Sequence, residues 1–174
     1  MASASLAKFS ELLRHQLYEC NDQQIPISKE VSYLENFIGL EKLRQNPNLQ
    51  VTVNIDEGYS SGIGIAPFIL MTFVENAFKH VSKHKTEPNW INIDLSLTGM
   101  QLSFTVSNSA GKKESRDVVD YGGIGLKNVQ RRLDLVYPDQ YKLDIQDNTD
   151  DFSVKLDLQL SVVTINPSVQ LISE

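Results

Sequence analysis

The sequence is poor in the features that mark several large classes of protein. Its 174 residues include one cysteine, Cys20, so no disulfide can form within the chain and a reducing compartment is expected. No apolar run approaches the length of a membrane-spanning helix, and the N-terminus has no apolar core of signal-peptide length. The sequence also contains no internal repeat and no low-complexity tract. These absences favour a water-soluble, compact domain.

Positive charge is scarce as well. The chain has 16 Lys and Arg against 22 Asp and Glu, for a net charge of -6. A general nucleic-acid binder needs a basic face to neutralise phosphates, and this balance argues against that class. Basic residues cluster only locally, at Lys112 and Lys113 and around Lys127, Arg131 and Arg132. With 41% hydrophobic residues, the chain is long enough for one compact domain plus an extension.

Hydrophobic periodicity predicts two helices followed by elements in the order β-α-β-β-α-β-β. Helices are predicted over residues 5–20, 28–44, 67–82 and 126–136, strands over 50–55, 90–97, 100–107, 141–146 and 152–160, and loops over 58–64, 83–88 and 109–121. Ser28 is the expected N-cap of the second helix, with Glu30 in its first turn, and Pro67 is expected in the first turn of the third. The order fits an α+β fold with helices on one face of a mixed sheet.

The helix predicted after Pro67 has one apolar arc and one polar arc. The apolar arc comprises Leu70, Met71, Phe73, Val74, Ala77, Phe78 and Val81, and the polar arc comprises Thr72, Glu75, Asn76, Lys79, His80 and Lys83. One interpretation is a solvated surface. The other is a phosphate site. There Asn76 would give an oxygen to Mg²⁺, Glu75 and His80 would act as acid–base or orienting groups, and Lys79 would offset phosphate charge.

A glycine loop, Gly-Gly-Ile-Gly-Leu at residues 122–126, opens directly onto the helix that is predicted to end before Pro138. Loop amides and a helix N-terminus together suit phosphate oxygens, although such glycines can also form only a tight turn. No Lys-Ser/Thr pair follows, as in a Walker loop, and no strand leads directly into the loop, as in a dinucleotide fingerprint. An Asn-bearing helix and this loop together predict a nucleotide site.

These separated motifs resemble a known family. Val74–His80 (Val-Glu-Asn-Ala-Phe-Lys-His) resembles the N-box of the GHKL ATPases, and Gly123–Leu126 (Gly-Ile-Gly-Leu) resembles their second glycine box. The longer strings Glu-Asn-Ala-Phe-Lys-His and Gly-Ile-Gly-Leu-Lys-Asn-Val-Gln-Arg-Arg-Leu resemble the LytS-like sensor histidine kinases, as do residues 12–18 and 30–37. The resemblance covers about residues 5–160, with the motifs in the family's order.

The resemblance implies a fold and a division of the chain. The fold would be the GHKL (Bergerat) two-layer α/β sandwich, with a mixed five-stranded sheet, helices on one face and an N-terminal helical extension. Residues 1–22 would end a dimerisation and phosphotransfer helix, residues 23–160 would form the ATP-binding catalytic domain, and residues 161–174 would be a tail of unknown role. The phosphoacceptor histidine is expected on a helix upstream of this chain, because the neighbours of His15 match the second dimerisation helix instead.

The resemblance also implies cofactors, partners and site residues. Such a domain binds ATP and Mg²⁺ and transfers the γ-phosphate to a histidine, from which it passes to a response regulator. The implied partners are the protein's own phosphoacceptor helix, within a homodimer, and a receiver domain. Neither nucleic acid nor direct membrane contact is implied for this cytoplasmic domain of a membrane-anchored bacterial sensor, and alone it is not expected to phosphorylate itself. At matching positions, Asn76 would bind the metal, and the nucleotide would contact Asn76, Asn108, Lys112, Gly123, Gly125 and Leu126.

The first glycine box departs from the family pattern. The family usually has Asp-x-Gly-x-Gly there, with the Asp accepting a hydrogen bond from the adenine amino group. This chain has Val106–Gly111 (Val-Ser-Asn-Ser-Ala-Gly), with Asn108 at the position of the Asp. An Asn oxygen can accept the same bond without charge, so weaker adenine affinity is expected. Residues 112–121 would form the lid over the nucleotide.

Two other classes stay open. One is a nucleotide-binding or inactive relay module, in which the substitution at Asn108 accompanies lost kinase activity. The other is a GHKL ATPase that hydrolyses ATP to drive conformational change. Such ATPases usually have a carboxylate one helical turn before the N-box Asn, where this chain has Thr72.

Overall fold

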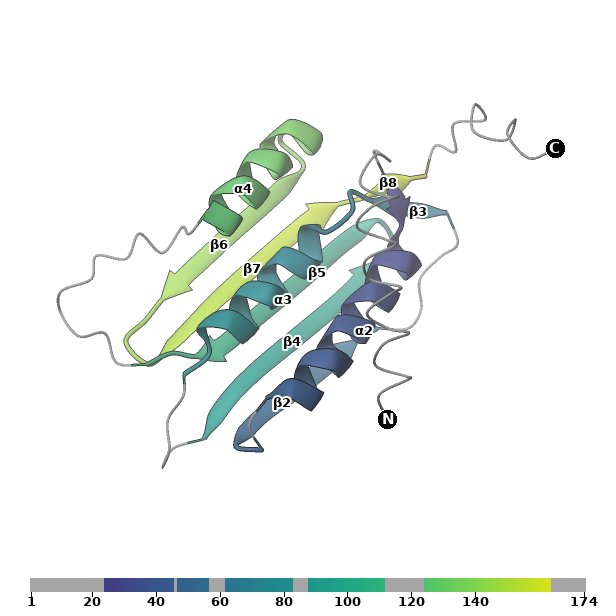
Figure 1. Cartoon of the computed structure of the whole chain (residues 1–174). Coiled ribbons are helices and arrows are strands. Elements are labelled where there is room, and N and C mark those ends of the chain that lie inside the picture. The colour runs from purple at the N-terminus through teal and green to yellow at the C-terminus, as the bar shows by residue number, and fades with distance from the viewer. Residues whose placement is uncertain (1–23, 46, 57–61, 83–87, 112–123, 164–174) are drawn as a thin grey trace.

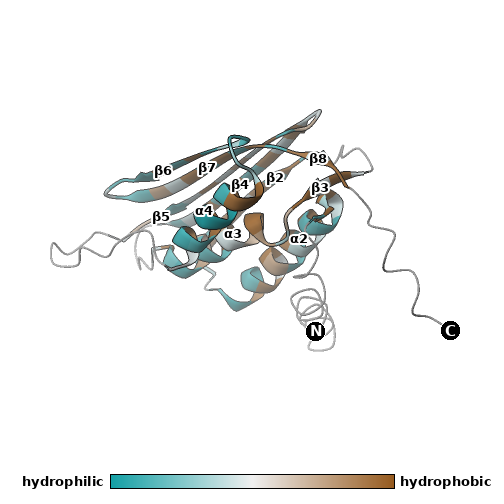
Figure 2. Ribbon diagram, turned by 90° about the horizontal axis from the view of Figure 1, so that it is seen from above, coloured by the Kyte–Doolittle hydropathy of each residue, from teal (hydrophilic) through white to brown (hydrophobic). Residues whose placement is uncertain are grey.

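The computed structural model describes residues 24–45, 47–56, 62–82, 88–111 and 124–163. In these ranges, three helices pack on one face of a five-stranded sheet (Figures 1 and 2). The predicted α+β sandwich is therefore confirmed. The helical extension predicted over residues 1–22 lies outside the described residues.

The main sheet has the strand order β2-β4-β5-β7-β6. Its strands are β2 (Leu49–Ile55), β4 (Asn89–Thr98), β5 (Gln101–Ser109), β6 (Tyr141–Asp147) and β7 (Asp151–Gln159). The sheet is mixed because β2 runs parallel to β4, whereas the other pairs are antiparallel. The predicted hairpin between β4 and β5 is confirmed, and Gly99 at its turn has a φ of 61°, a conformation that favours glycine.

Alternating apolar residues give each central strand one buried face. Ile91, Ile93 and Leu95 of β4 are buried, and the polar residues between them are more exposed. The buried faces of β5 and β7 continue this layer with Leu102, Phe104, Val106, Phe152, Val154, Leu156 and Leu158. The core of the protein therefore lies between the sheet and the helices (Figure 2).

The helical layer consists of α2 (Ile27–Arg44), α3 (Ile69–His80) and α4 (Ile124–Val136), with α3 in the middle (Figure 1). The predicted apolar arc of α3 is confirmed, since all of its seven members are buried. The Phe37 and Phe78 rings meet edge to face, with centroids 6.0 Å apart, and join α2 to α3. No helix of the described residues is long and apolar enough to cross a membrane.

A second, small sheet was not predicted. It has the order β1-β3-β8 and is built from β1 (Ile25–Pro26), β3 (Ile63–Ile65) and β8 (Ser161–Val162). Strands of two or three residues are too short to give a periodic signal, so the end of the predicted loop at residues 58–64 is in fact a strand. Gly64 at its centre is closely approached by side chains, because a Cβ there would lie 2.8 Å from Gln24 Oε1 and 2.9 Å from Val163 Cγ2, so a larger residue would displace them.

Two helix starts differ from the prediction. Helix α2 begins at Ile27 with Pro26 at its N-cap, directly after the β1 pairing, so Ser28 lies in the first turn and does not cap the helix. Helix α3 begins at Ile69, so Pro67 precedes it, and the N-cap is Phe68 with a φ of 63°. This left-handed conformation is unusual for a bulky residue and could not be anticipated from local sequence.

Candidate functional site

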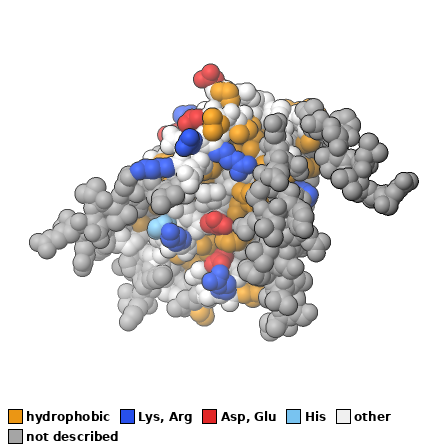
Figure 3. Space-filling model, turned by 45° about the horizontal axis from the view of Figure 1, so that its top comes forward, with side chains coloured by type: hydrophobic (Ala, Val, Ile, Leu, Met, Phe, Trp, Pro, Cys, Tyr) orange, Lys and Arg blue, Asp and Glu red, His pale blue; other side chains and the backbone are white. Residues whose placement is uncertain are grey.

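The predicted catalytic residues lie in the C-terminal half of α3, on its outer side. Glu75, Lys79 and His80 are exposed, and Asn76 is half-buried. Figure 3 shows basic, acidic and histidine side chains among apolar ones on this helical face of the molecule. We call Glu75, Asn76, Lys79 and His80 the polar stripe of α3.

Two groups of the polar stripe have shifted pKa values: that of Glu75 is raised and that of His80 is lowered. Partial burial and then the charge of Glu41 on α2 raise the pKa of the Glu75 carboxyl. Partial burial and then the neighbouring charge of Lys79 lower the pKa of His80. A carboxyl group with a raised pKa is a better proton acceptor at neutral pH, and a His with a lowered pKa is mostly uncharged there. These directions are compatible with the acid–base roles predicted for Glu75 and His80, which stay predictions.

Asn108, the predicted adenine residue, lies at the end of β5 and is 1% exposed. Its Nδ2 donates a hydrogen bond to the Ser109 carbonyl oxygen at 3.0 Å. Its Oδ1 is buried and has no hydrogen-bond partner among the described residues. A buried acceptor without a donor costs free energy, so this oxygen suits a donor from a ligand.

A buried polar cluster ties the end of α3 to the residue next to Asn108. The Ser82 N–H, two residues beyond α3, donates to the Ser109 carbonyl oxygen at 2.7 Å. The Ser82 Oγ lies 2.6 Å from Ser109 Oγ and 2.8 Å from Asn89 Oδ1. The end of β5 and the C-terminal end of α3 are therefore brought together, as a site shared by Asn108 and the polar stripe requires.

The start of α4 lies beside α3. Gly125 is exposed, and a Cβ at this position would lie 3.9 Å from Thr72 Cγ2. Thr72 and Asn76 are one helical turn apart and share a side of α3, so the N-terminus of α4 approaches the side that carries Asn76. The side chain of Leu126 is 4% exposed and lies in the core, which leaves only its backbone to face a ligand. Gly123 and Lys112 lie outside the described residues.

The residues present fit a magnesium ion that is shared with phosphates. Within the described ranges, no group of three or more His, Cys, Asp or Glu could hold a metal ion. Mg²⁺ is commonly bound by few protein ligands, with phosphates and water completing its octahedral shell. The half-buried Asn76, near a helix N-terminus that can face phosphates, suits that kind of site.

Three side chains that bind the backbone just before α3 were missed by the sequence prediction. We call Glu30, Arg132 and Tyr137 the α3 clamp. Its hydrogen bonds are Ala66 N–H to Tyr137 Oη (2.7 Å), Arg132 Nη1 to the Pro67 carbonyl (2.6 Å) and Phe68 N–H to Glu30 Oε2 (3.1 Å). The sequence placed Glu30 only in a first turn and Arg132 only in a basic cluster, because contacts between such distant residues leave no local signal.

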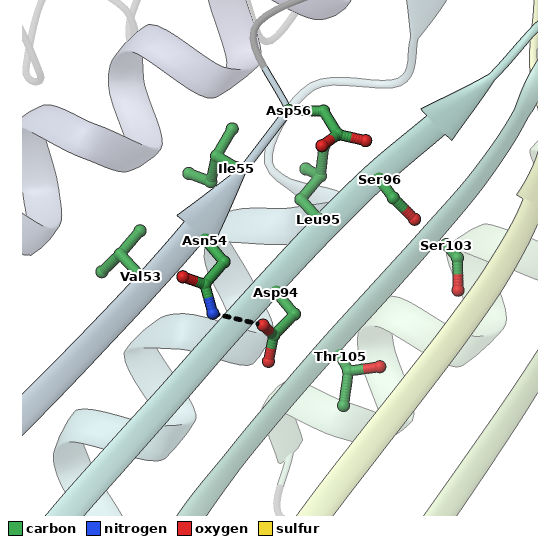
Figure 4. A pocket seen from close by; sticks show the side chains of 9 residues that line it. All are labelled: Val53, Asn54, Ile55, Asp56, Asp94, Leu95, Ser96, Ser103 and Thr105. Atoms are coloured by element: carbon green, nitrogen blue, oxygen red, sulfur yellow. Dashed lines mark hydrogen bonds between the residues drawn. The ribbon is translucent and has the colours of Figure 1, made fainter.

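A pocket on the open face of the sheet is separate from these residues. It is lined by Val53, Asn54, Ile55, Asp56, Asp94, Leu95, Ser96, Ser103 and Thr105. Figure 4 shows its polar side chains in front of the strands, with the helices behind. Asn54 Nδ2 donates to Asp94 Oδ1 at 2.7 Å, so part of this polar lining is already paired. The pocket therefore lies on the opposite side of the sheet from the polar stripe.

Comparison with known proteins agrees with the motifs. A family model described as histidine kinase matches residues 1–49. The sensor protein LytS of Streptococcus mutans is 28% identical over 160 residues, which cover 86% of this chain and 27% of that protein. LytS of Staphylococcus epidermidis is 27% identical over 151 residues, which cover 81% of this chain and 25% of that protein. The chain is a relative of the LytS-like sensor histidine kinases.

A solved structure supports the fold of this LytS relative. The histidine kinase domain of the blue-light activated histidine kinase from Erythrobacter litoralis has a TM-score of 0.56 at 17% identity, covering 90% of this chain and 80% of that domain. The likeness concerns the fold alone at this identity. The predicted resemblance to the LytS-like sensor histidine kinases is confirmed by these relatives. The chain spans about a quarter of the length of the LytS proteins that it matches.

Proposed function

We propose that this chain is the catalytic ATP-binding domain of a sensor histidine kinase. It binds ATP·Mg²⁺ and transfers the γ-phosphate to a histidine on an upstream helix outside this chain, and an aspartate of a response regulator receives it next. The observation that carries the proposal is the buried Asn108 Oδ1, which has no hydrogen-bond partner among the described residues and lies near the end of α3. The family of the relatives supports the same conclusion.

Each site residue has a distinct part in nucleotide binding. The adenine amino group donates to Asn108 Oδ1, which replaces the missing partner of that oxygen. Asn76 would supply an oxygen to Mg²⁺, which would provide charge neutralisation for the phosphates. Lys79 offsets further phosphate charge, and the exposed backbone at Gly125 is available to the phosphates. The predicted roles of Gly123 and Lys112 fall outside the described residues.

The transfer step needs a proton acceptor as well as correct placement. A ring nitrogen of the acceptor histidine attacks the γ-phosphorus, and the bond from that phosphorus to the bridging oxygen breaks as ADP leaves. Glu75, whose carboxyl pKa is raised by partial burial and by Glu41, takes the proton that the attacking imidazole loses. His80 orients the phosphate as an uncharged donor. Placement and charge neutralisation provide most of the rate enhancement.

The residue at position 72 disfavours the ATPase alternative. Thr72 stands where such an ATPase would place the carboxylate that activates water. Its Oγ1 donates to the Phe68 carbonyl oxygen at 2.8 Å, so the hydroxyl is engaged within its own helix. Asn108 keeps the inactive relay module as the competing function, since an uncharged acceptor binds adenine more weakly than Asp does.

The full protein would then act in a larger assembly. The relatives carry the name sensor protein, so we propose a homodimeric sensor anchored in a membrane, with this domain on the cytoplasmic side. Its partners are the phosphoacceptor helix of the same protein and a receiver domain.

Calorimetric titration of ATP·Mg²⁺ into the chain tests this function, with Asn76→Ala as the comparison. We expect the unmodified chain to bind and Asn76→Ala to lose the Mg²⁺-dependent part of the affinity. Absence of binding by the unmodified chain contradicts the kinase function in favour of the inactive module. If binding is seen, a chain extended to include the upstream helix is expected to form acid-labile phosphohistidine, and a chain that binds but never transfers phosphate is a relay module.

A further inference from the structure

The segment that leads into α3 is held by side chains from both neighbouring helices. Residues 66–68 are consecutive, and each has one backbone group bonded by a different member of the α3 clamp. Glu30 comes from α2, whereas Arg132 belongs to α4 and Tyr137 directly follows it. Glu30 is 1% exposed and Tyr137 is 2% exposed, so two of these bonds are made by buried side chains. The α3 clamp therefore joins all three helices of the helical layer at one point.

The conformation at this point needs such support. Phe68 has a φ of 63°, which is disfavoured for a bulky side chain and persists only where the surroundings impose it. No side chain of the segment caps α3. The carboxylate of Glu30 accepts the Phe68 N–H in its place, at the positive end of the helix dipole. The entry into α3 is thus determined by residues far away in the sequence.

Because a helix is rigid, a displacement at one end moves residues at the other end. Asn76 lies eight residues beyond Phe68, which corresponds to about 12 Å along the helix axis at the usual rise per residue. A shift or rotation at Phe68 therefore moves Asn76 and Glu75 relative to Gly125 at the start of α4. Because the nucleotide must contact α3, α4 and β5 together, its affinity depends on that placement.

We propose that Glu30 and Arg132 are positioning residues for the nucleotide site, which fix the axial position and rotation of α3 and thereby the places of Asn76 and Glu75. This inference rests on the proposed function, because it assigns the positioning to an ATP·Mg²⁺ site. Neither side chain touches the nucleotide. Their effect on binding is transmitted by α3.

The charge state of Glu30 changes close to neutral pH. Burial raises the pKa of Glu30 to about 7, against the opposing effects of the Phe68, Leu70 and Met71 amides and of Arg132. The titratable and charged groups that face it are Arg132 and Tyr137. Protonated Glu30 keeps a carbonyl oxygen for the Phe68 N–H, so this bond does not require the charge.

The test is calorimetric titration of ATP·Mg²⁺ into the full chain and into four variants, well below their unfolding temperatures. Glu30→Ala removes the acceptor, and Arg132→Met removes the donors but keeps an apolar stem. Glu35→Ala and Arg131→Met are matched controls, because both residues are exposed on the same helices. Glu30→Ala and Arg132→Met are each expected to weaken binding about fivefold or more, while the controls bind like the unmodified chain.

Two further measurements separate positioning from general loss of stability. Glu30→Gln keeps a carbonyl oxygen for the Phe68 N–H and is expected to restore affinity at about pH 8 to within about twofold. Between about pH 8 and about pH 6, on either side of the Glu30 pKa, the unmodified chain is expected to stay within about twofold of Glu30→Gln in affinity, because protonated Glu30 also keeps a carbonyl oxygen for the Phe68 N–H. The nucleotide and His80 titrate alike in both proteins. Val53→Ala, a destabilising change on β2, should leave affinity unchanged.

The outcomes distinguish this inference from the proposed function. Unchanged affinity in folded Glu30→Ala and Arg132→Met overturns the inference and leaves ATP binding intact. If the unmodified chain does not bind ATP·Mg²⁺, the proposed function fails. Hydrogen exchange of the α3 amides then tests whether Glu30 positions α3. Faster exchange of the α3 amides through Asn76 in Glu30→Ala, compared with Glu35→Ala, then supports the positioning of the helix. Equal exchange in these two variants overturns it.

Discussion

The two ends of α3 are built in contrasting ways. At its N-terminal end, backbone groups of residues 66–68 are bonded by the α3 clamp, and the side chains concerned are mostly buried. In its C-terminal half, the polar stripe is exposed or half-buried. One end is thus determined by contacts within the protein, whereas the other presents groups to a ligand. The contrast indicates that the helix is held at one end so that its other end can be placed accurately.

Two carboxyl groups make the same contrast. Burial is the largest cause of a raised pKa for both Glu30 and Glu75, but Glu30 is 1% exposed and Glu75 is an exposed residue that is also influenced by Glu41. Titration of Glu30 therefore affects the folded state itself, whereas titration of Glu75 affects the chemistry at the surface of α3.

Removing the apolar body of α3 should disrupt both ends at once and have the largest effect. Phe73 is 2% exposed, and its ring lies 6.5 Å from that of Phe104 on β5. We expect Phe73→Ala to lower the free energy of unfolding by about 3–5 kcal/mol, measured by urea denaturation. Phe73→Leu is the control and should cost clearly less. Equal stability of Phe73→Ala and the unmodified chain would contradict a core centred on α3.

The charge of Glu30 should make stability depend on pH. Its folded-state pKa of about 7 exceeds the ordinary value of 4.5, so the folded state binds the proton more tightly. The associated stability is present below pH 4.5 and is lost as pH rises to about 7, by about 3 kcal/mol in total. Thermal unfolding across this range, with Glu30→Gln as the reference, isolates the effect. A parallel pH dependence in both proteins would show that Glu30 is not desolvated.

The hydroxyl of Tyr137 tests the clamp without changing its charge. Tyr137→Phe leaves the buried Ala66 N–H without its acceptor, so we expect a loss of about 1–3 kcal/mol in the free energy of unfolding. Tyr141→Phe removes a hydroxyl that bonds to Asp134 at the surface and should cost about 0–1 kcal/mol. Equal losses in the two variants would mean that the Ala66 bond has no special weight.

Changes to the polar stripe should affect stability least. Lys79 is exposed, so Lys79→Ala should change the free energy of unfolding by no more than about 0.5 kcal/mol. The same variant should weaken ATP·Mg²⁺ binding by about fivefold, through the loss of one charge near the phosphates. Lys142→Ala on β6 is the control for general loss of positive charge. If both variants bind equally well, Lys79 does not face the phosphates.

The parts of the fold that depend on local patterns could be predicted from the sequence. The apolar arc of α3 and the turn at Gly99 follow from residue types at neighbouring positions. The strands β3 and β8 could not be predicted, because two or three residues carry no period. The left-handed Phe68 was also missed, since it depends on Glu30, 38 residues earlier.

The candidate site also has parts that the sequence predicts and parts that only the folded structure shows. The motifs gave Asn76 and Asn108 their predicted roles, which stay predictions. The burial of Asn108 and the lack of a partner for its Oδ1 are properties of the packed structure. The bond from Arg132 to the Pro67 carbonyl spans 65 residues, and no local rule connects those positions. Sequence therefore indicated the groups that suit a ligand better than the groups that hold them in place.

The most direct test of the account is the base preference that Asn108 confers. ATP·Mg²⁺ and GTP·Mg²⁺ are titrated in parallel into the chain and into Asn108→Ala, with folding checked by circular dichroism. The account predicts that the unmodified chain prefers ATP, because adenine has an amino donor at ring position 6 for the Asn108 Oδ1 whereas guanine has a carbonyl oxygen there, and that Asn108→Ala loses this preference. Equal binding of both nucleotides by the unmodified chain, or binding of neither, would contradict it.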